Sequence, residues 1–330
     1  MAPTDSTFDD RLFDRYGGVC LFDNKFDYSE LVENLNSIIP FPVYIVNNVN
    51  FNAQAITKNS SRAIGIFTGL LNTCHEEVSN FMSSWQARPS ELRDNRKVDG
   101  IQTWRWHWND LDHQSLSAHS CLLQCMVLFL VAHEVAHLLG GHHRIVADHG
   151  DSEIYTEFPA FAMSREHAQL RRAIELDADC AAARSSLRLW RMISQSFGRV
   201  PIFDASSSDE FWLAAICFFF HLADRCGRVS ANRQLDTHPT PGARLNQVVA
   251  QATFDPLIVP LLDLQRTTTP LVTESIRYFD QAPGDRLIAL NDPSPVADEL
   301  EVIWATLKVH AADLGRERDR ISSEMKLKAT

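Results

Sequence analysis

The chain has 330 residues, of which 45% are hydrophobic and 22% are charged, and its formal net charge is −11. These proportions are typical of a soluble globular protein that is long enough to bury a full hydrophobic core. Because phosphate binding needs concentrated lysine and arginine, the acidic balance argues against nucleic acid as a main partner.

The cysteines and the N-terminal residues indicate the cellular compartment in which we expect the protein. The 7 cysteines are an odd number and form no CxxC pair, unlike the disulfide framework of a small secreted protein. The first residues are acidic and lack the basic-then-apolar pattern of a signal peptide. The longest apolar run, Cys125–Ala132, is far shorter than the roughly 20 residues that span a bilayer. We therefore expect a cytoplasmic protein with reduced thiols and no membrane contact.

In chain order, periodicity and turn residues predict many helices and few strands. Phe41–Asn48 and Ala63–Phe67 have the composition of strands, and the tryptophan-rich segment 86–113 has that of a strand or surface loop. The helices are expected within residues 1–40, at Gly69–Trp85, at 114–139, at Met163–Ser196, after Ser207–Glu210, from Pro241 and from about Val296. The predicted fold class is therefore α+β, helix-rich, with a small sheet.

The segment His133–His137 reads HEVAH and lies in the most apolar of these helices. Two histidines four residues apart project from one helix face and can share a tetrahedral ion. Glu134 then lies beside the open position of that ion, where it can act as general base and acid toward a metal-activated water. Unpaired ionisable groups are costly to bury, so these three residues in an apolar helix indicate one bound Zn²⁺.

Two residues compete to be the third zinc ligand. The sequence also satisfies HExxHxxGxxH, the metzincin pattern, in which His143 completes the site. Alternatively, Glu175 and Asp179 lie four apart on the next long helix and face one side. Glu175 would then bind the zinc, and Asp179 would accept the other N–H of a ligand histidine. We favour Glu175, and we interpret His142 and His143 as polar residues at a helix end.

Five segments share a pattern with one group of peptidases. They are Asn52–Ala55, Ile64–Leu71, His133–His142, Glu175–Ala182 and Thr237–Pro239 with Arg244. In this order they resemble the HtpX-like and CAAX-prenyl-protease-like gluzincin peptidases. The segments His133–His142 and Glu175–Ala182 also resemble, more weakly, the ImmA/IrrE-type regulatory peptidases and the Lit-type phage-exclusion peptidases. The resemblance implies a zincin core over residues 41–250 with an insertion at 75–120. A lead and helix at 1–40 would precede this core, and a helical extension at 251–330 would pack on it.

The resemblance also implies roles for individual residues. His133, His137 and Glu175 would bind zinc, and Glu134 would be catalytic. His238 would stabilise the oxyanion of the reaction, and Arg244 would pair with a carboxylate near the metal. A strand at the sheet edge would border the cleft and pair with an extended protein or peptide substrate. The residues of that strand are Ile64, Gly65, Ile66 and Phe67.

The sequence thus predicts a soluble zinc-dependent endopeptidase that acts on a specific intracellular protein. Two alternatives remain open: a metzincin-type peptidase that uses His143, and a metal-binding regulatory or interaction protein without turnover. A purely structural zinc has no need of a base at Glu134, which favours the enzyme. A regulatory partner that uncovers a latent cleft is also compatible with the sequence.

Overall fold

The computed structural model describes most of the chain, and all structural statements below concern the residues that it describes. These are residues 13–14, 16–23, 26–58, 61–86, 118–147, 164–196, 205–227, 238–254 and 296–329. Residues 87–113 of the tryptophan-rich segment and most of the expected insertion at 75–120 lie outside these ranges.

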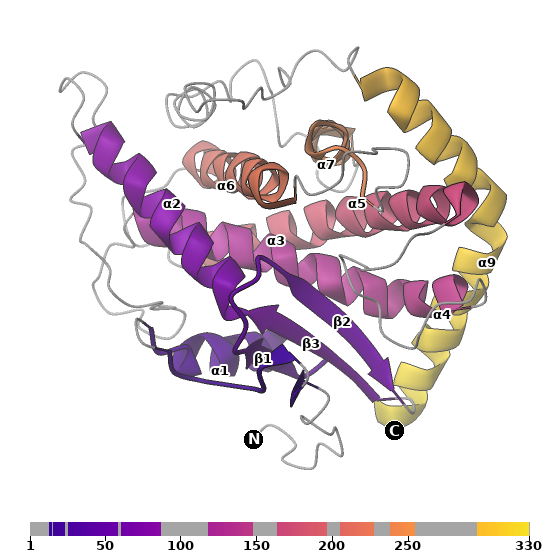
Figure 1. Cartoon of the computed structure of the whole chain (residues 1–330), viewed down its shortest axis with the longest axis horizontal. Coiled ribbons are helices and arrows are strands. Elements are labelled where there is room, and N and C mark those ends of the chain that lie inside the picture. Colours follow the sequence, from indigo (N-terminus) through magenta and orange to yellow (C-terminus); the bar gives the residue numbers. More distant parts are fainter. Residues whose placement is uncertain are drawn as a thin grey trace.

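Two long helices, α3 (Ala118–Gly140) and α5 (Arg165–Ser196), run side by side through the centre of the molecule (Figure 1). Both agree with the helices expected at 114–139 and Met163–Ser196. The α3 helix is apolar nearly all round, and its residues from Cys121 to Val131 are buried. Since its whole circumference is covered, neighbouring elements must pack on every side of it.

Further helices of the described residues pack around this pair. α6 (Ala205–Gly227) packs on both α3 and α5, and α7 (Pro241–Phe254) packs on α5. The short α4 (His142–Ala147) follows α3, and α9 (Ala297–Ala329) runs along the outer edge of the molecule (Figure 1). The α9 helix contacts α3, α4, α5 and α7. The described part of the C-terminal segment therefore packs on the helices that carry His133, His137 and Glu175.

In the described part of the chain the sheet has three strands, β1 (Val43–Val46), β2 (Ala53–Lys58) and β3 (Ser61–Phe67), in the order β1-β3-β2. The central strand, β3, pairs parallel with β1 and antiparallel with β2. The prediction that this strand forms the sheet edge is therefore wrong. Ile64, Gly65, Ile66 and Phe67 each have strand partners on β1, and the backbone of this strand is also paired with β2, so it cannot accept a further strand.

Among the described residues, the edge strand on the side of α3 is β2, which was not among the strands expected from sequence. It packs against α3, whereas the opposite edge strand, β1, contacts α1 (Ser29–Ile38). The α2 helix (Thr68–Gln86) follows β3 directly and also contacts α3. The continuous burial of Ala63–Phe67 has a physical explanation, because a strand that is covered on both faces reads as an unbroken apolar run.

Among the described residues, one helical segment, Cys121–Gly140, is long and apolar enough to cross a membrane, but 78% of its most apolar 18-residue window is buried inside the structure. Such burial is that of a core helix and is consistent with a soluble protein. Most of the cysteines, including Cys121 and Cys125 on this helix, are buried free thiols. The helix-rich α+β architecture expected from sequence is thus confirmed at this level.

Candidate metal centre

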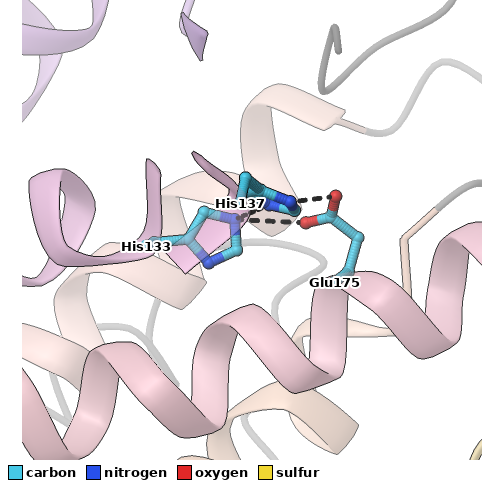
Figure 2. A group of neighbouring side chains, drawn as sticks. All are labelled: His133, His137 and Glu175. Carbon is cyan, nitrogen blue, oxygen red and sulfur yellow. Dashed lines mark hydrogen bonds and ion pairs between the residues drawn. The ribbon is translucent and has the colours of Figure 1, made fainter. Parts of the chain in front are cut away.

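The three expected zinc ligands meet between α3 and α5. His133 and His137 lie one turn apart on α3, and Glu175 faces them from α5 (Figure 2). The Nε2 atoms of the two histidines are 2.9 Å apart. Glu175 places Oε2 at 3.2 Å from Nε2 of His133 and Oε1 at 3.5 Å from Nε2 of His137. All three residues are 1% exposed.

The donor atoms fit a tetrahedral zinc ion. With zinc–nitrogen and zinc–oxygen distances of about 2.0–2.1 Å, two donors of a tetrahedral site lie about 3.3 Å apart. The observed separations of 2.9, 3.2 and 3.5 Å bracket this value. Among the described residues, these three form the one group of histidine, cysteine and acidic side chains whose donor atoms could hold a metal ion.

The electrostatics of the three ligands also favour a cation. Burial alone would lower the pKa of His133, but its hydrogen bonds with Asp179 and Glu175 raise it well above the ordinary value. Burial lowers the pKa of His137 to about 3. Burial opposes ionisation of Glu175, yet the surrounding histidines hold its pKa well below the usual range. The buried carboxylates of Glu175 and Asp179 therefore favour positive charge at this position, and a divalent ion can supply that charge.

Glu134 follows His133 on α3 and is fully buried. An ionised carboxylate is costly to bury unless positive charge lies nearby, and a metal ion between His133 and His137 would provide that charge. The position of Glu134, on the helix turn that carries both histidines, is the one that the HExxH pattern assigns to a general base.

Asp179 and Arg244 lie behind His133. Oδ1 of Asp179 is 3.0 Å from Nδ1 of His133, so the carboxylate can accept the N–H of this imidazole and direct its Nε2 toward the metal position. Arg244, on α7, donates two hydrogen bonds to Asp179, from Nε at 2.7 Å and from Nη2 at 2.8 Å. Both expected positioning residues are therefore beside the site.

His238 also reaches this cluster. Its Nε2 atom is 3.4 Å from Oε2 of Glu175, and its side chain is 14% exposed. Burial, opposed in part by Glu175, lowers the pKa of His238 to about 4, so the imidazole is neutral at neutral pH. A neutral imidazole can donate one hydrogen bond toward the site.

The structure does not bring His143 to the metal ligands. His143 lies on the short α4 helix beyond α3, and it is His142 that contacts the ligand pair, with Nδ1 at 2.9 Å from Nδ1 of His137. From the sequence His142 was expected to be a polar residue at a helix end, and Asp177, which contacts it, was not among the expected site residues. The available signal was the position of His142 directly after two glycines.

In comparisons with known proteins, no family model, no curated protein and no solved structure matches the chain. The resemblance to gluzincin peptidases therefore depends on the motif residues, and it remains a prediction.

Proposed function

We propose that this protein is a zinc-dependent endopeptidase. The observation that carries the proposal is the buried set of His133, His137 and Glu175, with Glu134 between the two histidines in the sequence. A structural zinc is usually closed by four protein ligands, whereas a catalytic zinc has three and keeps a position open. Three donors and an adjacent carboxylate match the second kind of site.

Zinc, when bound, supplies a Lewis acid that polarises a carbonyl and lowers the pKa of water to about 7. Glu134 takes a proton from the attacking water and passes it to the leaving amine. His238 donates a hydrogen bond to the oxygen on which negative charge develops. Asp179 fixes the tautomer of His133, and Arg244 holds Asp179 in place.

The substrate of this proposal is an extended protein segment that pairs with β2. This strand is the sheet edge next to α3, and α3 carries both histidine ligands. An edge strand offers unpaired backbone donors and acceptors to an extended peptide. β2 therefore takes the role that sequence analysis gave to the central strand.

The proposal is tested with Glu134→Gln, which keeps the size of the side chain and removes the base. We expect the variant to bind zinc like the wild type and to cleave neither a fluorogenic casein nor any cellular protein. Comparing new protein termini in cells that express either form would identify the substrate. Zinc binding by the wild type without any cleavage would refute the proposal and leave a metal-binding interaction protein.

A further inference from the structure

His142 lies on the far side of His137 from the metal position, and it is completely buried. Its Nδ1 atom is 2.9 Å from Nδ1 of His137, and its Nε2 atom is 3.1 Å from Oδ2 of Asp177 on α5. The same carboxylate oxygen accepts a hydrogen bond from Nη2 of Arg318 on α9. These contacts form a continuous series of hydrogen bonds from His137 to α9.

Once His137 binds a metal through Nε2, the positions of the protons in this series of hydrogen bonds are fixed. Its Nδ1 must then carry a proton, which it donates to Nδ1 of His142. His142 therefore carries its own proton on Nε2, and it donates that proton to Asp177. Oδ2 of Asp177 also accepts the hydrogen bond from Nη2 of Arg318, so this carboxylate oxygen accepts from both neighbours. Each hydrogen-bond donor in this series thus faces an acceptor.

Two glycines make room for this arrangement. A Cβ atom on Gly140 would lie 2.3 Å from Nε2 of His142, too close for any side chain at that position. Gly141 has a φ of +67°, which turns the chain between α3 and α4 and is favourable for glycine. A Cβ atom there would lie 2.8 Å from Cβ of Glu317 on α9. The Gly140-Gly141 pair therefore admits the imidazole on one side and the C-terminal helix on the other.

The hydrogen bonds that support His137 through His142 resemble those that support His133 through Asp179. Asp177 and Asp179 are two residues apart on α5, and each supports one ligand histidine, directly in the case of Asp179 and through His142 in the case of Asp177. The two supporting arginines differ in exposure, because the side chain of Arg244 is 7% exposed and that of Arg318 is 49% exposed. Solvent screens the exposed pair, so His142 and Asp177 carry more of the effect than Arg318.

We propose that His142 is a positioning residue for the ligand His137, with Asp177 fixing its tautomer and Arg318 of α9 orienting Asp177. The inference rests on the proposed function only in taking His133, His137 and Glu175 as a zinc site. It requires no catalysis. The inference makes α9 part of the metal centre, because Arg318 on this helix supplies the last hydrogen-bond donor of the series.

The test measures zinc affinity by competition with a chelator on the full-length protein. We expect His142→Ala to weaken zinc binding by about 10- to 100-fold, the usual effect of removing an outer partner of a ligand histidine. Asp177→Ala should weaken it in the same direction, and Arg318→Ala by less. Arg316→Ala is the matched control, since this exposed arginine of α9 pairs with Asp313 on its own helix. It should leave the affinity unchanged.

His142→Asn separates positioning from packing. The Oδ1 atom of asparagine occupies about the place of Nδ1 in histidine, so it can accept the His137 proton but cannot reach Asp177 as histidine does. Its zinc affinity should lie between those of His142→Ala and the wild type. In zinc-loaded protein with ¹⁵N-labelled histidine, the Nδ1 proton of His137 should be protected from exchange, and this protection should be lost in His142→Ala.

Wild-type zinc affinity together with an unchanged His137 proton signal in His142→Ala would overturn the inference and leave the proposed function intact. Weakened affinity in His142→Ala would support the inference even if the wild-type protein cleaved no substrate. Failure of the inference and failure of the proposed function are therefore distinguishable.

Discussion

Replacing Arg244 with alanine should destabilise the metal-free protein strongly. Arg244 and Asp179 are both buried and are joined by two hydrogen bonds of 2.7 and 2.8 Å, and the guanidinium also lies 5.0 Å from the ring centre of Phe220. Removing one partner of a buried ion pair leaves an uncompensated charge and costs about 3–5 kcal/mol. We expect Arg244→Ala to lower the free energy of unfolding by about this amount.

The same variant should weaken zinc binding, because Asp179 is then no longer held against Nδ1 of His133. The double variant Asp179→Leu with Arg244→Met separates the two effects. It leaves no unpaired charge, so it should recover most of the lost stability. It also removes the acceptor for His133, so its zinc affinity should stay about 10- to 100-fold below that of the wild type.

Urea unfolding of the metal-free proteins and chelator competition measure these two quantities. Arg225→Ala is the control for the loss of an ion pair, since Arg225 pairs with Glu77 at the surface. It should change the free energy of unfolding by at most about 1 kcal/mol. A double variant that binds zinc as tightly as the wild type would refute the role given to Asp179. An equally small effect of Arg244→Ala would refute the energetic argument.

Two further predictions concern the turn between α3 and α4. Gly140→Ala should reduce both stability and zinc affinity, because its Cβ would lie 2.3 Å from Nε2 of His142, whereas Gly315→Ala on α9 meets no atom within 4 Å and should stabilise the protein. The expected gain for Gly315→Ala is about 0.5–1 kcal/mol, and equal thermal shifts in the two variants would contradict the prediction. Burial and the adjacent Arg144 lower the pKa of His143 to about 4. Because the unfolded chain binds this proton at a pKa of about 6.5, stability should fall as the pH decreases from about 6.5 to about 4. His143→Gln should reduce that slope in unfolding measurements, and an unchanged slope would show that His143 does not cause it.

The sequence predicted the parts of the site that depend on spacing within one helix. The four-residue spacing of His133 and His137, and that of Glu175 and Asp179, specifies a common face on each helix. Burial of these residues followed from the apolar side chains around them. The contact between the two helix faces depends on the tertiary fold. It was expected because zinc requires a third ligand and because both segments resemble those of gluzincin peptidases.

The strand order and the contacts of His142 could not be predicted from the local sequence pattern. The order of strands in a sheet depends on which edges pair, so an apolar run such as Ala63–Phe67 does not show whether it is central or peripheral. Likewise, His142 contacts His137 because Gly141 turns the chain at a positive φ. His142 and its partner Asp177 are 35 residues apart in the sequence, and Asp177 and Arg318 are 141 residues apart. No spacing rule connects positions so distant.

The central claim is that His133, His137 and Glu175 hold a zinc ion. The most direct test is the zinc content of the purified wild-type protein, of Glu175→Ala and of His143→Ala, measured by elemental analysis after dialysis. We predict one zinc per chain in the wild type and in His143→Ala, and a large loss in Glu175→Ala. Full zinc content in Glu175→Ala together with loss in His143→Ala would contradict this account and support a metzincin-type site.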